Sequence, residues 1–187
     1  RNENNGCRVG VTYDAHDDNM PWPDYMDWQV AALIEMYRVA KPGASLFYNH
    51  KVRTLGGELI HPMTWLVRPD NPWTVRQEII WNRKSTHNNP IQLFTQLDER
   101  IYWLTKGDPT LPDLPIDGST VWDSHGPKFK QSDWHPAPFT DELPRMILRA
   151  MHVAPGTVVL DPFAGSCTTI KVAATEFKCT AIGVDVS

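Results

Sequence analysis

The feature that most limits the fold is an apolar run, a polar loop, a helix and a second apolar run near the C-terminus. Residues 157–160 predict a buried strand, which Asp161 follows directly. Residues 168–177 predict a helix, and residues 180–186 predict a second buried strand. A strand, a helix and a second strand in this order form a right-handed βαβ unit of a parallel sheet. The sequence therefore predicts an α/β fold.

The rest of the chain also mixes predicted helices and strands. Apolar residues at helical spacing predict a helix that opens at Pro23 and stops at Lys41-Pro42-Gly43. We expect further helices over residues 59–68 and between Thr140 and Pro155. Expected strands in this part of the chain are 45–48, 78–81 and 100–104.

Length and composition indicate one globular domain in a reducing compartment. The chain has 187 residues, of which 41% are apolar and 21% charged, and it contains no apolar stretch of membrane-spanning length. Cys7, Cys167 and Cys179 have no metal-ligand spacing, so we expect no metal site. Their odd number argues against a disulfide framework, so we expect a reducing, cytoplasmic location. The net charge of −4 gives no overall attraction to nucleic acid, so DNA binding would need a local basic face.

The loop after the first strand of the βαβ unit is a candidate ligand site, because ligands of open α/β sheets bind at the carboxyl ends of strands. Gly165 allows a tight turn, and Ser166 and Thr168 offer hydroxyls at the start of the helix. The sequence separation between Asp161 and Asp185 is close to the roughly 20 residues after which a carboxylate that binds ribose hydroxyls is expected.

The chemistry of this loop favours a ligand without phosphate. It lacks the three-glycine dinucleotide pattern and the lysine of a phosphate loop, and acids flank it instead. S-adenosylmethionine has a ribose and an ammonium group but no phosphate, and it suits this pattern. An incidental Asp-Pro turn in a Rossmann-like core stays open as an alternative, as does a nucleotide-dependent Rossmann enzyme.

Residues 160–169 resemble the S-adenosylmethionine motif of amino-group DNA methyltransferases, Asp-Pro-Phe-x-Gly-Ser-Gly-Thr-Thr. Residues 135–139, followed by Glu142-Leu143, resemble the motif that precedes it in the permuted, beta-type class. Asp18-Asn19-Met20-Pro21-Trp22 with Tyr25 and Trp28 is a further match. The resemblance implies a Rossmann-like, S-adenosylmethionine-dependent methyltransferase fold with a mostly parallel sheet, helices on both faces and a circularly permuted motif order.

The resemblance also implies a division of one methyltransferase domain, residues 1–187. Residues 1–106 would form the catalytic half, 107–134 a connection or short recognition region, and 135–187 the cofactor-binding half. Cys167 stands where the family usually has glycine, which predicts a slightly altered loop. The residues expected to line the cofactor site are Asp161, Phe163, Gly165, Ser166, Thr168, Asp185, His135, Pro136 and Phe139.

The family methylates amines with an Asp/Ser/Asn-Pro-Pro-Tyr loop, and no Pro-Pro-aromatic sequence occurs in this chain. That loop would lie just before Arg1, so we expect a chain truncated at both ends and name no catalytic residue. The target base, adenine at N6 or cytosine at N4, stays open. A catalytically inactive cofactor-binding or DNA-binding subunit remains an alternative, as does an RNA or protein methyltransferase of the same fold.

Double-stranded DNA is the partner that the resemblance implies, together with a homodimer and a cognate restriction endonuclease. Small basic and polar clusters in predicted loops could contact phosphates or base edges, although a solvated surface loop would have the same composition. The candidate DNA-binding residues are Lys51, Arg53, Arg83, Lys84, Asn88, Asn89, Lys128 and Lys130.

Overall fold

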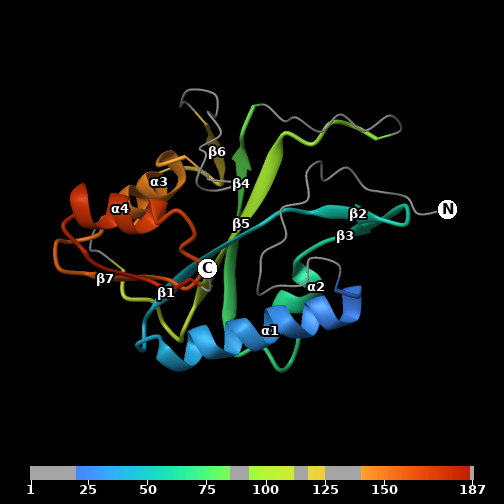
Figure 1. Ribbon diagram of the computed structural model, residues 1–187, viewed down its shortest axis with the longest axis horizontal. Coiled ribbons are helices and arrows are strands. Elements are labelled where there is room, and N and C mark those ends of the chain that lie inside the picture. The colour runs from blue at the N-terminus through green and yellow to red at the C-terminus, as the bar shows by residue number, and fades with distance from the viewer. Residues whose placement is uncertain (1–19, 85–92, 112–117, 125–139, 186–187) are drawn as a thin grey trace.

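The computed structural model describes residues 20–84, 93–111, 118–124 and 140–185 (Figure 1). The helices in these ranges are α1 (Trp22–Val39), α2 (Met63–Leu66), α3 (Glu142–Ala150) and α4 (Thr168–Thr175). The strands are β1 (Ser45–His50), β2 (Arg53–Leu55), β3 (Glu58–Ile60), β4 (Thr74–Asn82), β5 (Asp98–Thr105), β6 (Val121–Asp123), β7 (Val158–Asp161) and β8 (Thr180–Gly183).

The largest sheet has the strand order β1-β5-β4-β6. β5 runs antiparallel to both β1 and β4, whereas β4 and β6 are parallel. The predicted βαβ unit is present as β7, α4 and β8, and its two strands pair in parallel. The larger sheet is therefore mixed rather than mostly parallel as expected: its β1–β5 and β4–β5 pairs are antiparallel, and parallel pairs occur at β4–β6 and, in the smaller sheet, at β7–β8.

Helices cover both faces of this sheet, as expected. Tyr102 and Leu104 of β5 pack into one core with α1, α2 and Trp73. Ile101 of the same strand packs on the opposite face with α3. Successive side chains of a strand point to opposite faces, so the uninterrupted apolar run of β5 matches a strand that is buried on both sides.

The long helix α1 is fixed at its C-terminal end by a cation from another element. Lys106, which follows β5, donates through Nζ to the carbonyl oxygens of Tyr37 at 2.7 Å and Ala40 at 2.8 Å. These carbonyls belong to the last turn of the helix, where they have no partner within the helix and where a positive charge is favourable. The predicted helix stop at Lys41-Pro42-Gly43 is confirmed.

The helix predicted over residues 59–68 is wrong in its first part. Residues 58–60 form β3, which pairs with β2 in an antiparallel hairpin, and α2 begins only at Met63. Gly56 and Gly57 form the turn with φ of 58° and 86°. Two consecutive left-handed residues are the requirement of a tight hairpin turn, so the Gly-Gly pair was the sequence signal for this hairpin.

The β7–β8 sheet is packed on one face only among the described residues. Val159 and Ala181 pack with α3 and α4 around buried Val172 and Ala173. On the other face, the side chains of Val158, Leu160 and Ile182 are between 41% and 50% exposed. None of the helices in the described ranges is long and apolar enough to cross a membrane.

Candidate functional site

The loop between β7 and α4 lies at the carboxyl ends of two adjacent strands. Asp161 pairs with Gly183 in the parallel register, so both strands end at the same edge of the sheet. Asp161 accepts a hydrogen bond from the backbone N–H of Phe163 at 3.1 Å, and Asp185 accepts one from the N–H of Gly165 at 2.7 Å. The two predicted acids therefore lie on either side of the loop and hold its backbone.

The loop turns through two left-handed residues. Gly165 has φ of 46°, and Cys167, the N-cap of α4, has φ of 60° and ψ of 27°. The cysteine thus adopts the conformation that favours glycine, at a cost of roughly 1–2 kcal/mol for a residue with a Cβ. Next to it, the hydroxyls of Ser166 and Thr168 lie 3.1 Å apart and form a hydrogen bond.

Gly183, the last residue of β8, allows the second strand to approach the loop closely. A Cβ at this position would lie 2.9 Å from Cγ1 of Ile170 and 3.0 Å from Cβ of Ala164. Ala164 is buried within the loop, and its N–H donates to the carbonyl of Val184 at 2.9 Å. The absence of a side chain at Gly183 therefore positions the loop and α4 against β8, and sequence reasoning had not identified this residue.

Trp28 of α1 packs against Phe163 of the loop. The ring centroids of Trp28 and Phe163 are 5.9 Å apart at an interplanar angle of 58°. This separation lies within the range of favourable aromatic pairs. Phe163 still has 57% of its surface exposed, so a large part of its ring remains accessible beside Trp28. The contact joins the first half of the chain to the predicted cofactor motif.

Tyr25, the neighbour of Trp28 in α1, contacts His50, and the partners of His50 fix its tautomer. Nδ1 of His50 lies 2.8 Å from the carbonyl oxygen of Lys51, and Nε2 lies 2.7 Å from the hydroxyl of Tyr25. A carbonyl can only accept, so Nδ1 carries the proton and Nε2 accepts from the tyrosine. Burial lowers the pKa of His50 to about 4, so its ring is neutral at physiological pH.

The groups around the loop fit S-adenosylmethionine better than a phosphorylated nucleotide. Two carboxylates, Asp161 and Asp185, hold the loop, and carboxylates accept hydrogen bonds from hydroxyl and ammonium groups but repel phosphate. The lysine at the start of α4, Lys171, is paired with Asp141 at 3.0 Å. The exposed Phe163 ring adds an apolar surface for a ligand.

The structure brings six of the nine expected cofactor-site residues into or next to this loop. They are Asp161, Phe163, Gly165, Ser166, Thr168 and Asp185. His135, Pro136 and Phe139 lie outside the described residues, as do Asn88, Asn89, Lys128 and Lys130 among the candidate DNA contacts. Trp28, Tyr25 and His50 were not predicted as site residues, although Tyr25 and Trp28 belong to the segment that resembles the family.

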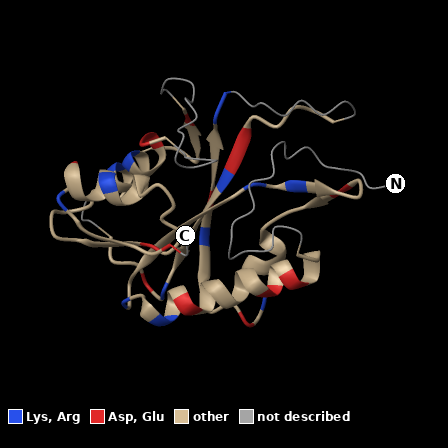
Figure 2. Ribbon diagram, in the orientation of Figure 1, with Lys and Arg blue, Asp and Glu red and all other residues tan. Residues whose placement is uncertain are grey.

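The four described DNA-binding candidates divide into two pairs. Arg83 forms an ion pair with Glu99, and Lys84 lies 3.1 Å from Asp123. Lys51 and Arg53, at the start of the β2–β3 hairpin, form no ion pair with the described part of the chain. In Figure 2, the Lys, Arg, Asp and Glu residues of the described ranges are distributed over several elements. Lys51 and Arg53 are therefore the candidates near His50 whose charge no acid of the described ranges neutralises.

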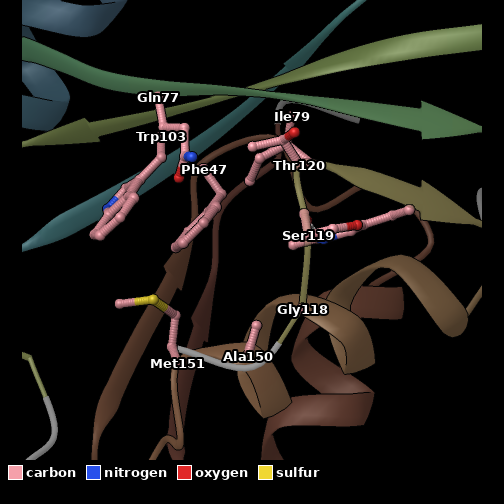
Figure 3. A pocket seen from close by; sticks show the side chains of 10 residues that line it. Phe47, Gln77, Ile79, Trp103, Gly118, Ser119, Thr120, Ala150 and Met151 are labelled. Atoms are coloured by element: carbon pink, nitrogen blue, oxygen red, sulfur yellow. Dashed lines mark hydrogen bonds between the residues drawn. The ribbon is translucent and has the colours of Figure 1, made fainter. Parts of the chain in front are cut away.

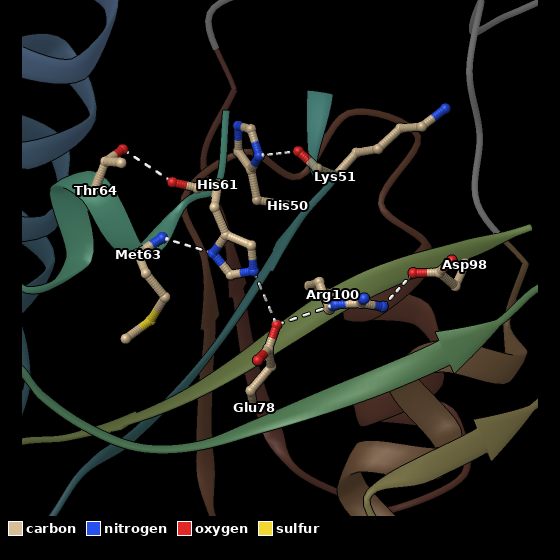
Figure 4. Close-up of polar contacts among 8 residues, drawn as sticks. All are labelled: His50, Lys51, His61, Met63, Thr64, Glu78, Asp98 and Arg100. Atoms are coloured by element: carbon tan, nitrogen blue, oxygen red, sulfur yellow. Dashed lines mark hydrogen bonds and ion pairs between the residues drawn. The ribbon is translucent and has the colours of Figure 1, made fainter. Parts of the chain in front are cut away.

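Beside His50, a polar cluster joins β3, β4 and β5 (Figure 4). Oε1 of Glu78 lies 3.1 Å from Nε of Arg100 and 3.4 Å from Nε2 of His61, and Arg100 also pairs with Asp98. His61 accepts from the N–H of Met63 at 3.2 Å, which leaves its Nε2 to face the glutamate. The charge of Arg100 is thus compensated within the fold, and this cluster holds the hairpin region onto the sheet.

A cavity of about 290 Å³ lies elsewhere, between the large sheet and the end of α3 (Figure 3). Ala150 and Met151, at the end of α3, line it, and it shares no described residue with the loop after β7. None of the predicted site residues in the described ranges lines it. Its walls are mainly aromatic and apolar: Phe47, Trp103, Ile79, Trp122, Ala150 and Met151, with Gln77, Gly118, Ser119 and Thr120.

Comparison with known proteins gives a family and a set of related folds. Residues 3–187 match the family model N6_N4_Mtase, described as DNA methylase. No curated protein sequence is significantly similar to the chain. The PvuII DNA methyltransferase, which is cytosine-N4-specific, superposes with a TM-score of 0.74 at 18% identity over 96% of this chain and 72% of that one.

Two further structures are similar and were solved with the cofactor. The putative DNA modification methylase TTHA0409 from Thermus thermophilus, complexed with S-adenosyl-L-methionine, gives a TM-score of 0.65 at 23% identity over 89% of this chain and 73% of that one. The M1.HpyAVI–SAM complex gives 0.62 at 20% identity over 84% and 76%. These similarities confirm the predicted Rossmann-like methyltransferase fold.

Proposed function

The chain belongs to the N6_N4_Mtase family of DNA methylases, and from this premise we propose its reaction and its site. The reaction is transfer of a methyl group from S-adenosylmethionine to an exocyclic amino group of double-stranded DNA, at adenine N6 or cytosine N4. The single observation that carries the assignment of the site is the pair of carboxylates, Asp161 and Asp185, that hold one loop at the ends of β7 and β8.

Each described residue of the loop has a role in this proposal. Asp185 accepts hydrogen bonds from the ribose hydroxyls, since a carboxylate has two oxygens and several lone pairs. Gly165 allows the backbone to approach the cofactor, and Ser166 and Thr168 hold the start of α4. Phe163 covers an apolar part of the cofactor with its exposed ring. His135, Pro136 and Phe139 complete the cofactor site in the same proposal.

When bound, the cofactor would supply a methyl group on a positively charged sulfonium: the amine nitrogen would bond to the methyl carbon as its bond to sulfur breaks, leaving a neutral thioether, and the nitrogen would lose a proton to solvent. The protein residues have to hold the two reactants in line and exclude water. Two carboxylates near the loop favour a cationic cofactor over its neutral product, because opposite charges attract. This difference promotes exchange of the product for fresh cofactor.

Double-stranded DNA is the proposed substrate, and Lys51 and Arg53 are its first candidate contacts. They lie at the end of β1 and the start of the hairpin, next to His50 and Tyr25, and they have no acid partner in the described ranges. The proposal retains residues 1–106 as the catalytic half and 107–134 as the connection or recognition region. It also includes a homodimer, a cognate restriction endonuclease and a cytoplasmic location.

A product analysis tests the reaction. A form of the chain that includes the family's Asp/Ser/Asn-Pro-Pro-Tyr loop is incubated with S-adenosylmethionine that carries a labelled methyl group and with DNA, RNA and protein in separate samples. Nuclease digestion of the DNA should release labelled N6-methyladenine or N4-methylcytosine. Label in RNA or protein alone would contradict the proposal. Cofactor binding without transfer to any acceptor would favour the inactive cofactor-binding subunit. The variant Asp185→Ala should form less labelled product, because it lacks the carboxylate proposed to bind the ribose. Asp108→Ala, which removes an exposed acid outside the loop, is its control.

A further inference from the structure

A series of ring contacts leads from the core of the large sheet to the cofactor loop. Trp65 is completely buried, and the ring of His50 lies edge-on to it at 4.9 Å. Tyr25 contacts His50 through its hydroxyl and lies 6.0 Å from Trp28, which in turn contacts Phe163. We call Trp65, His50, Tyr25, Trp28 and Phe163 the aromatic series.

The inner members of the series have fixed positions. Trp65 donates through its indole N–H to the hydroxyl of Tyr48, which donates to Gln29 at 2.6 Å. His50 is fixed by its bonds to Lys51 and Tyr25. Trp28 is therefore carried by a helix whose inner face is anchored by hydrogen bonds as well as by packing.

The ring of Phe163, the outer member of the series, is exposed and has no hydrogen-bonding group to fix it. Its backbone N–H is tied to Asp161, but its ring is 57% exposed, so the ring is not placed by burial in a core. Apolar surface of this size is unfavourable in water, and a ligand that covers it removes that cost. The neighbouring Trp28 ring restricts where the Phe163 ring can lie before a ligand arrives.

We propose that Trp28 is a positioning residue that holds Phe163, and through it the cofactor loop, in the conformation that binds S-adenosylmethionine. This inference rests on the proposed cofactor. Trp28 acts through Phe163, so removing its ring should weaken cofactor binding only while Phe163 is present. Pre-organisation of this kind changes affinity by lowering the ordering cost of the loop.

Calorimetric titration with S-adenosylmethionine tests the proposal in the parent and in variants of this chain. Trp28→Ala should raise the dissociation constant about three- to tenfold, the range of a typical aromatic pair, and Trp28→Phe should restore most of the affinity. Ile34→Ala, at an exposed position of the same helix, is the matched control and should bind as the parent does. Equal affinity of Trp28→Ala and the parent would overturn the proposal.

A double-mutant cycle shows whether Trp28 acts through Phe163. The variant with both Trp28→Ala and Phe163→Leu should bind no more weakly than Phe163→Leu alone. Effects that multiply would show that Trp28 contributes independently of Phe163, which contradicts the proposal. Circular dichroism of each variant establishes that it is folded. If Trp28→Ala does not fold, Trp28→Leu, which keeps an apolar side chain but removes the aromatic ring, takes its place in the same cycle.

Amide hydrogen exchange without cofactor separates this inference from the proposed function. Trp28→Ala should speed exchange at loop residues 163–167 about threefold or more, while exchange in β5 stays unchanged. Unchanged exchange in the loop would overturn the positioning role. Failure of the parent to bind S-adenosylmethionine would contradict the proposed cofactor instead, and the exchange result would still decide whether Trp28 orders the loop.

Discussion

The backbone N–H of Gly165 donates a 2.7 Å hydrogen bond to the carboxylate of Asp185. This bond connects the turn after β7 to the residue that follows β8, so the two ends of the βαβ unit are held together before any ligand is bound. A hydrogen bond to an ionised acceptor is stronger than one between neutral groups. The loop is therefore organised by an acid that the sequence had assigned to ribose binding.

Replacement of Cys167 by glycine should stabilise the protein. Cys167 has φ of 60°, and removal of its Cβ relieves the left-handed strain. The greater freedom of glycine in the unfolded chain offsets part of this gain, so we expect about 0.5–1 kcal/mol in the free energy of unfolding by urea titration. Cys167→Ala keeps the Cβ and is the matched control. A gain of the same size in Cys167→Ala would show that backbone strain is not the cause.

Gly183→Ala should have the opposite effect. The new Cβ would lie about as close as 2.9 Å to Ile170 and 3.0 Å to Ala164, which forces the loop and α4 away from β8. We expect a loss of about 1–3 kcal/mol in the free energy of unfolding, and weaker S-adenosylmethionine binding. Adding Ala164→Gly removes one of the two clashing groups and should recover part of both losses. Unchanged stability in Gly183→Ala would mean that the loop and α4 can move away from β8 without a cost in free energy.

His50 should make stability depend on pH. Its pKa falls to about 4 in the folded protein, below the unfolded value of about 6.5, so only the unfolded chain takes up the proton between these values. The stability that neutral His50 contributes is full above about pH 6.5 and is lost progressively as pH falls towards 4, by about 3 kcal/mol in all. His50→Gln should show a flatter profile in this window by thermal unfolding; identical profiles would contradict the buried neutral histidine.

The two pairs of candidate DNA contacts should differ in their effect on salt dependence. Lys51→Gln and Arg53→Gln should each reduce the slope of log affinity against log salt by about 0.9, because each cation displaces one counterion. Lys84→Gln should change the slope less, since Lys84 is already paired with Asp123. Fluorescence anisotropy with a labelled duplex measures the three slopes. Equal losses in all three variants would show that internal pairing does not decide which cations contact DNA.

The βαβ unit could be predicted because its signals are local. Asp161, Gly165 and Asp185 follow from apolar runs of strand length and from the residues next to them, and each lies where that pattern requires. The order of strands in the large sheet could not be predicted, because it depends on pairing between distant segments. β5 lies between β1 and β4, although both of them precede it in the sequence.

Other differences have identifiable causes. The β2–β3 hairpin was missed although Gly56-Gly57 is a strong turn signal, because the apolar residues after it also fit a helical spacing. β6 lies in the segment predicted as a connection, since three residues are too few for a period-two pattern. The contact between Trp28 and Phe163 joins two halves of the chain, and no local pattern contains that information.

The central claim is that the loop after β7, closed by Asp185, binds S-adenosylmethionine. Calorimetric titration of the parent, Asp185→Ala, Asp185→Asn and Asp108→Ala with this cofactor tests it most directly. We predict that the parent and Asp108→Ala bind equally, that Asp185→Ala binds at least about tenfold more weakly through loss of charged hydrogen bonds, and that Asp185→Asn lies between. Binding of folded Asp185→Ala with the affinity of the parent, or no binding by the folded parent, would contradict the claim.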